Sequence, residues 1–300
     1  MPGASFCPFC GCTMADTSAR PLSRSVPPPD RDALDEPCSV IYAGEDEMDV
    51  RRVGRLVAEA VEQPLPDVTR KMRTSKGFLA TGLPPDRART LAEKAERELK
   101  APILLVADED CAPLPSAMRM RQAVFDAEGL RCDAYTWSVT EHVTASWDAV
   151  FLISCGRLEI NEVSEAPAPS PTRSSIFSRK PPNLITNTHH EFLLDIILYD
   201  PEPNAGAEGW RRLRLDQNTS AFSLTEMVQG PESQVGPLYR SSVNLERFAL
   251  DVPRNRGLSF LATGAADSAW QSLTFLSKRD FDSYTHWLMQ LVRYGRPILA

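Results

Sequence analysis

The pattern of apolar and polar residues divides the chain into two ordered regions and two segments without a pattern. Residues 13–37 and 164–183 are rich in proline and serine and show no repeat of apolar positions. Such segments cannot bury a core, so we expect a disordered tether and a disordered insert. The ordered regions are 38–108 and 113–296, and a short cysteine-containing segment, 1–12, precedes the tether.

The first ordered region predicts a small α/β domain. Short apolar runs in "CSVIYAG" and "APILLVAD" are typical of strands, and the second, apolar throughout, is expected to be central in its sheet. Three segments between them repeat apolar residues with the period of a helix, around residues 46–63, 64–77 and 84–100. "FLATGL" is a brief extended piece before the third. The predicted order is strand, helix, helix, strand, helix, strand.

The second ordered region predicts a β-rich domain that ends in a helix. A hairpin is expected to turn near Ala127–Gly129, and a further turn is expected at Cys155–Gly156. "HHEFLLDIILYD" and "WRRLRLD" predict strands, while "SSVNLERFAL" and "SKRDFDSYTHWLMQLVRYG" predict helices, the last one capped by Ser277. Together the regions predict an α+β, multi-module fold. A small α/β sandwich domain is followed by a β-rich, barrel-like domain with a C-terminal helix.

The element order of the first region and the pattern "GFLATGLPPDRARTLAEKAERELKAPILLV" resemble the C-terminal domain of the bacterial ribosomal stalk protein. The peptide-binding adaptor of the bacterial Clp protease has a related fold. "EQPLPDV" stands where the stalk family has a Gly-Leu-Gly-Leu-Lys pattern, so the resemblance implies the fold and not ribosome binding. In the family, basic residues of the helical face contact translation factors. The nearest counterparts here are Arg51, Arg52, Arg55, Arg70, Lys71, Arg73 and Lys76.

Many short strands followed by a C-terminal amphipathic helix resemble the pleckstrin-homology superfold, a bent barrel closed by one helix. "WDAVFLISCGRL" is similar to the bacterial version, in which a tryptophan opens a strand. The resemblance spans residues 115–296, with 164–183 inserted between strands and an additional helix around 242–250. It implies a fold and no particular function.

Composition limits the partners of the protein. The formal net charge of −7 argues against nucleic acid as a general partner, because phosphate contacts need a basic surface. No apolar run is long enough to cross a bilayer, and the N-terminus lacks the pattern of a secretory signal. The seven cysteines are odd in number and do not form a disulfide framework, so we expect a cytoplasmic protein.

The N-terminal "FCPFCGCTM" is typical of one half of a zinc ribbon. Cys7 and Cys10 have the spacing that places two thiolates on one metal ion, and structural zinc needs four ligands. No second Cys-x-x-Cys follows, so the remaining ligands are expected from Cys12 and Cys38, or from a second chain. A degenerate ribbon with free thiols is the alternative, and redox chemistry at Cys7 and Cys10 is a third.

Other candidate chemistry is sparse. His189 and Glu191 could share one face of a strand, whereas His189 and His190 point to opposite faces, so a polar strand start explains this cluster better than a metal site. His286 is expected on the surface of the final helix. The chain has no phosphate-binding glycine loop and no Gly-x-Ser-x-Gly elbow, so we do not expect an enzyme.

These observations predict a non-catalytic protein-interaction or regulatory module. We expect a protein partner to bind the second helix through Arg70, Lys71, Arg73 and Lys76, with a solvated charged face as the alternative. Two other functions are a zinc-dependent regulator of association and recruitment to a membrane surface. Arg212 and Arg214, which share one face of "WRRLRLD", are the candidate lipid-binding residues. The pattern does not predict an oligomeric state.

Overall fold

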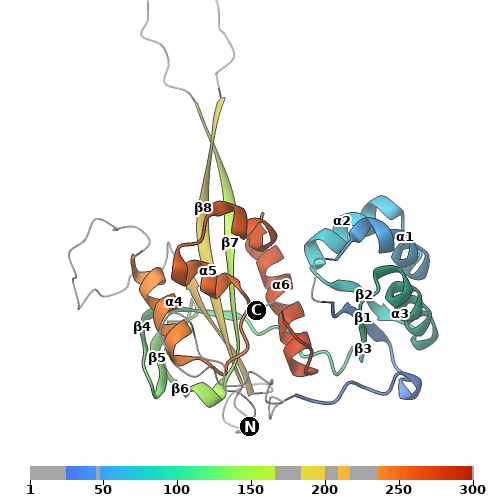
Figure 1. Ribbon diagram of the computed structural model, residues 1–300, viewed down its shortest axis with the longest axis horizontal. Helices are drawn as coiled ribbons and strands as arrows, with labels where there is room; N and C mark the ends of the chain where they lie inside the picture. The colour runs from blue at the N-terminus through green and yellow to red at the C-terminus, as the bar shows by residue number, and fades with distance from the viewer. Residues whose placement is uncertain (1–24, 45–47, 166–183, 200–208, 217–235, 299–300) are drawn as a thin grey trace, which may run out of the picture.

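The N-terminal domain is a three-stranded antiparallel sheet carrying three helices (Figure 1). In this computed structural model, the described residues are 25–44, 48–165, 184–199, 209–216 and 236–298. The strand order is β2-β1-β3, and the helices pack on one another and on the sheet. The order of elements predicted for residues 38–108 is confirmed. The elements are β1 (Cys38–Tyr42), α1 (Val50–Val61), α2 (Leu65–Ser75), β2 (Phe78–Leu83), α3 (Pro85–Leu99) and β3 (Ile103–Ala107).

The expectation that the closing strand is central was wrong. β1 is the central strand, and β3 lies at an edge of the small sheet. β3 is nevertheless buried throughout, because the segment before β1 covers it: Arg31 donates hydrogen bonds to Glu96 of α3 and to the backbone oxygen of Ile103. Residues 25–37, predicted as part of the tether, therefore include a 3-10 helix, η1 (Arg31–Ala33), that is anchored to α3.

The C-terminal region is built around a seven-stranded sheet within the described residues. The strand order is β10-β7-β8-β9-β4-β5-β6, and its two end strands do not pair with each other. The sheet is therefore open, whereas a barrel-like domain was expected. Among the strand pairs that the structure describes in this sheet, β4 with β9 and β10 with β7 run parallel and the others antiparallel. The strands are β4 (Ala117–Phe125), β5 (Gly129–Tyr135), β6 (Thr140–Ser146), β7 (Val150–Glu165), β8 (Leu184–Tyr199), β9 (Trp210–Asp216) and β10 (Thr274–Phe275).

The pattern of apolar residues did not predict β6, although it did predict two of the helices. In β6, Val143 alone is buried, so apolar residues do not alternate along the strand. The helices around "SSVNLERFAL" and at the C-terminus are confirmed, with Ser277 accepting a hydrogen bond from the backbone N–H of Asp280. The helical elements are η2 (Trp147–Ala149), α4 (Gly236–Phe248), α5 (Gly257–Thr263), η4 (Asp267–Leu273) and α6 (Lys278–Arg293).

The turn expected at Cys155–Gly156 was also wrong. β7 runs unbroken through these residues, and Gly156 pairs with Leu193 of β8. A Cβ atom at Gly156 would lie 2.6 Å from the Phe275 ring and 2.8 Å from the Phe281 ring. The glycine therefore serves the close packing of two aromatic rings on the strand and not a change of chain direction.

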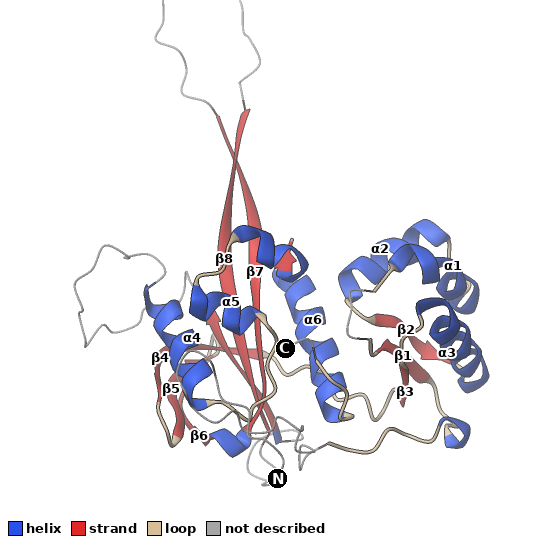
Figure 2. Cartoon of the chain, in the orientation of Figure 1, coloured by secondary structure: helices blue, strands red, loops and turns tan. Residues whose placement is uncertain are grey.

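Helix α6 lies between the large sheet and the N-terminal domain (Figure 2). Its side chains are buried on several sides, as expected of a helix covered by protein on more than one face. Trp287 donates a hydrogen bond of 2.7 Å from Nε1 to the backbone oxygen of Tyr42 in β1. Gly77, with φ of +111°, lies so close that an added Cβ would be 2.4 Å from Nε1 of Trp287. The two modules are therefore packed together through α6.

Candidate interaction sites

Helix α2 presents most of the predicted partner-binding residues to solvent. Val68 and Met72 are buried one turn apart, so the side chains of Arg70, Lys71 and Arg73 project from the exposed side of the helix. Arg70 pairs with Asp67 at 2.5 Å, and its side chain stays 78% exposed. Exposed pairs of this kind contribute little to stability. These cations are therefore available for contact with another molecule.

Lys76 differs from the other three predicted residues. It ends α2 in a left-handed conformation, and its Nζ lies 5.1 Å from the centroid of the Phe275 ring in β10. The side chain is half-buried at the seam between the two modules. The structure thus separates Lys76 from the exposed cations and gives it an internal partner.

Helix α1 adds further exposed cations beside α2. The helices contact each other: an added Cβ at Gly54 would lie 3.4 Å from Leu65 and 3.5 Å from Thr69. The arginines of α1 are exposed and have no ion pair within the described part of the chain. We call the exposed cations of both helices the α1–α2 basic surface. Its members are Arg51, Arg52, Arg55, Arg70, Lys71 and Arg73.

The acidic residues of these helices are already engaged. Asp49 caps α1 by accepting hydrogen bonds from the backbone N–H groups of its first turn. Glu59 lies 3.9 Å from Lys94, and Glu62 lies 2.8 Å from Arg87, both on α3. Asp67 of α2 pairs with Arg70, so it neutralises one cation of the surface. Among the described residues, the α1–α2 basic surface still keeps an excess of positive charge.

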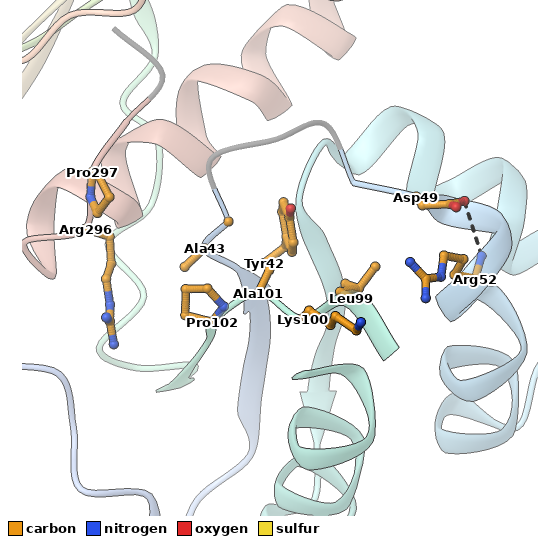
Figure 3. A pocket seen from close by; sticks show the side chains of 11 residues that line it. Tyr42, Ala43, Asp49, Arg52, Leu99, Lys100, Ala101, Pro102, Arg296 and Pro297 are labelled. Carbon is orange, nitrogen blue, oxygen red and sulfur yellow. Dashed lines mark hydrogen bonds between the residues drawn. The ribbon is translucent and has the colours of Figure 1, made fainter. Parts of the chain in front are cut away.

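A pocket of about 540 Å³ opens beside this surface (Figure 3). Arg52 and Arg296 enter it from opposite sides, the first from α1 and the second from the segment after α6 (Figure 3). Apolar side chains and Lys100 line the space between them. Asp49, the carboxylate among the described lining residues, accepts hydrogen bonds that cap α1. The described lining thus offers cations and apolar contacts, and it lacks an acid–base pair.

Arg212 and Arg214, the predicted lipid-binding residues, lie in the interior. They project from β9 toward Asp195 of β8, and both side chains are at most 7% exposed. The Nε atom of Arg212 lies 2.9 Å from Asp195, and that of Arg214 lies 2.7 Å from it. Both guanidinium groups also bond to Asp282 of α6. Neither cation reaches a surface where a lipid headgroup could bind.

This buried network is electrically balanced. Burial alone would raise the pKa of Asp195, but Arg214 and Arg212 hold that pKa below its usual value. Burial alone would lower the pKa of Arg214, but Asp195 and Asp282 raise it. A neighbouring pair, Lys278 with Asp216, lies at 2.5 Å under the same helix. Three cations face three carboxylates among the described residues, so this network leaves no unpaired charge for a ligand. The buried position of Arg212 and Arg214 therefore does not support the lipid-binding role.

The predicted zinc ligands are only partly within the described chain. Cys7, Cys10 and Cys12 lie outside the described residues, so zinc binding there stays a prediction. Cys38 begins β1 in the core, and its Sγ donates a hydrogen bond of 3.0 Å to the backbone oxygen of Glu36. Burial, and then the charge of Asp108, raise the pKa of this thiol. To ligate zinc, Cys38 would have to leave the core and lose its proton.

The histidines occupy different surroundings from one another. His189 and Glu191 share a face of β8, with Nε2 and Oε1 3.9 Å apart, and no group of three metal-ligating side chains occurs among the residues that the structure describes. His286 was expected on the helix surface, which is wrong. It stacks on Phe78 with ring centroids 4.9 Å apart, and its Nε2 lies 2.9 Å from the backbone oxygen of Ala112. Burial lowers the pKa of His286.

Comparison with known proteins found no relative of this chain. Family models, curated proteins and solved structures were all compared with the chain, and none matches it. Within the described ranges, no helix combines the length and the apolarity that a membrane span requires. The functional argument therefore depends on the geometry and charge of the chain itself.

Proposed function

We propose that the protein is a non-catalytic interaction module that binds an acidic protein partner through the α1–α2 basic surface. One observation carries the proposal: exposed cations of the two helices have no ion pair with any described residue, while the described carboxylates of the same helices are engaged. The unpaired cations are Arg51, Arg52, Arg55, Lys71 and Arg73.

The charge of this surface is opposite in sign to that of the whole chain. The whole chain has a formal net charge of −7, whereas the α1–α2 basic surface gathers six exposed cations that attract an acidic partner. Such an arrangement steers a partner to one face and raises its rate of association. Long arginine and lysine side chains also present apolar stems beside their charges, which suits contact with a protein.

Binding of labelled poly-L-glutamate, followed by fluorescence anisotropy, tests the proposal. Lys71→Glu/Arg73→Glu places two negative charges on the surface and is expected to weaken binding at least about tenfold at low salt. The matched control is Arg97→Glu/Arg279→Glu, which changes the net charge equally at exposed positions of α3 and α6. The control is expected to retain most of the binding.

Equal losses in the two variants would show that net charge, and not this surface, governs binding. Retention of full binding by Lys71→Glu/Arg73→Glu would remove the α1–α2 basic surface as the contact. Either result contradicts the proposal.

A further inference from the structure

The hairpin of β5 and β6 carries the most exposed large apolar side chain that the structure describes. Trp137 is 96% exposed, and Val139 is 55% exposed. Both belong to the tight turn between the two strands, in which the backbone N–H of Thr136 donates a hydrogen bond of 2.9 Å to the backbone oxygen of Val139. We call Trp137, Ser138 and Val139 the hairpin tip. Residues 48–165 are described without a gap, so the chain on both sides of the tip is known.

Trp137 differs from the other tryptophans of the chain. All five are described: Trp270 and Trp287 are buried, and Trp147 and Trp210 are half-buried. Each of those four rings contacts another aromatic ring, whereas Trp137 has no ring contact and no hydrogen bond with any residue of the described ranges. Tight turns between strands favour glycine, asparagine and aspartate, so the turn does not require a tryptophan. The side chain serves neither the core nor the turn, which points to a contact outside the chain.

Two arginines of β4 lie behind the tip. Arg119 pairs with Tyr135 across the ladder, and the guanidinium carbon of Arg121 lies 4.2 Å from the centroid of the Tyr135 ring. The three side chains therefore share one face of the sheet. Both arginines are exposed, and neither forms an ion pair with a carboxylate of the described chain.

The acidic residues of the hairpin strands do not cancel these two charges. Asp133 is the acidic residue of β5, and its Oδ1 lies 3.0 Å from Nδ1 of His142. Glu141 is the acidic residue of β6, and its Oε1 lies 3.0 Å from Arg211. Asp133 also lies two residues further from the tip than Tyr135, on which Arg121 stacks. The part of the face next to the tip is therefore positively charged.

We propose that the hairpin tip inserts into the surface of an anionic lipid bilayer while Arg119 and Arg121 bind the lipid headgroups. Tryptophan and tyrosine are enriched at the membrane–water interface. A strand rises about 3.3 Å per residue, so the level of Tyr135 lies about 7 Å behind Trp137. The apolar faces of surface-bound helices enter the boundary between headgroups and acyl chains by a similar depth, roughly 5–10 Å. The apolar tip and the cations behind it thus match the two layers of an anionic surface.

The shape of the tip favours a bilayer over a second protein. A protruding turn buries few residues against a flat protein surface, whereas a stable protein interface buries about 800 Å² per partner. A bilayer surface accommodates a single protruding side chain, and each arginine near anionic lipid contributes about 1 kcal/mol. Strands β4, β5 and β6 lie on the side of the molecule away from the N-terminal domain (Figure 1). The tip is therefore separate from the α1–α2 basic surface.

Quenching of tryptophan fluorescence by vesicles with brominated acyl chains tests the proposal. The vesicles contain phosphatidylcholine and about one quarter phosphatidylserine, and the full chain is used. Wild type is expected to show quenching and a shift of emission to shorter wavelength, because Trp137 moves from water into the bilayer. Trp137→Ser is expected to lose the quenching and to weaken co-sedimentation with the vesicles about tenfold. Arg119→Glu/Arg121→Glu is also expected to weaken it about tenfold, and the remaining binding should depend less on salt.

Three control variants separate insertion of the tip from general attraction to lipid. Arg97→Glu/Arg279→Glu changes the net charge equally at exposed positions of α3 and α6. Lys71→Glu/Arg73→Glu alters the α1–α2 basic surface. Val124→Ser removes another apolar side chain, 54% exposed, at the end of β4 away from the tip. All three are expected to keep most of the quenching that wild type shows.

Four outcomes would overturn the proposal. Wild type shows no quenching; or Trp137→Ser binds the vesicles as strongly as wild type; or the two arginine variants lose binding equally. The fourth is association of wild type with itself that Trp137→Ser abolishes, without binding to vesicles, which would assign the tip to a second copy. Insertion of the tip and the binding of poly-L-glutamate use different residues, so this proposal and the proposed function can fail separately.

Discussion

The α1–α2 basic surface and the arginine pair of β9 contain the same residue type in opposite surroundings. Arg73 of α2 is exposed and pairs with no described carboxylate, whereas Arg212 and Arg214 are buried and share Asp195 and Asp282. Both groups were candidates for binding on the basis of charge and spacing. A buried arginine with carboxylate partners stabilises a particular packing, while an exposed and unpaired arginine is free to bind.

The difference originates in elements that are distant in the sequence. The exposed cations belong to helices whose described acidic residues pair with α3, cap α1 or, for Asp67, pair with Arg70. Arg212 and Arg214 are buried because β9 pairs with β8 on one side and with β4 on the other, and α6 covers the face on which they lie. Alternation along β9 identifies the shared face correctly, but it does not indicate what covers that face.

The largest expected effect comes from removing the buried carboxylate. Asp195→Asn leaves Arg212 and Arg214 with Asp282 alone, and we expect unfolding to become easier by roughly 3–5 kcal/mol, measured by urea denaturation. Asp67→Asn removes the exposed partner of Arg70 and is expected to cost less than about 1 kcal/mol. Similar losses of unfolding free energy in the two variants would contradict the difference described between the buried and the exposed cations.

A smaller effect is expected where the two modules meet. Gly77→Ala strains a backbone with φ of +111° and drives a Cβ atom into Trp287, so we expect a loss of about 3 kcal/mol. Gly264→Ala is the control without a clash: its φ of +64° lies in the left-handed region that alanine adopts at modest cost, no atom lies within 4 Å, and it should cost about 1 kcal/mol. Thermal unfolding of both variants measures the difference, and equal shifts in Tm would contradict the packing described for α6.

The pH dependence of stability should also reveal the charge of Asp195 in the buried network. The pKa of Asp195 is lower in the folded protein than its ordinary value of 3.8, so its ionised form favours folding. The stability it contributes is complete above about 3.8 and is lost as pH falls through the lower folded pKa. The difference in unfolding free energy between wild type and Asp195→Asn should therefore shrink below this pH. A difference that stays constant down to acid pH would show that the carboxylate is not held in its charged form.

The smallest effect on stability is expected at the α1–α2 basic surface. Lys71→Glu/Arg73→Glu replaces exposed side chains without buried contacts and should change the unfolding free energy by less than about 0.5 kcal/mol. The same variant is expected to lose most of its binding to poly-L-glutamate. A large loss of stability in urea denaturation would mean that these cations hold the fold, as those of β9 do.

Local patterns predicted much of the fold, and long-range packing explains what they missed. The six elements of the N-terminal domain follow from helical periods and short apolar runs, and Ser277 was identified as a cap from its spacing to Asp280. The apolar run of β3 suggested a central strand, but β3 lies at an edge and is buried by a segment without a periodic pattern, which Arg31 anchors. β7 runs unbroken through Gly156 because it pairs with β8, and the glycine leaves room for Phe275 and Phe281, more than one hundred residues later.

The candidate sites were predicted with similar limits. The exposed cations of α2 were identified correctly as surface residues, because Val68 and Met72 mark the buried side of the helix. Asp195 was missed, although a single aspartate inside the apolar run "FLLDIIL" signals a buried charge that needs a cationic partner. The same signal would have assigned Arg212 and Arg214 to the interior.

The most direct test of the contrast between the two groups of cations is arginine modification by phenylglyoxal, mapped by mass spectrometry with and without poly-L-glutamate. We predict that Arg55 and Arg73 react in the free protein and are protected by the polymer, while Arg212 and Arg214 stay unreactive in both samples. Protection confined to arginines elsewhere, or reaction of Arg212 and Arg214 that the polymer suppresses, would contradict the assignment of binding to the α1–α2 basic surface.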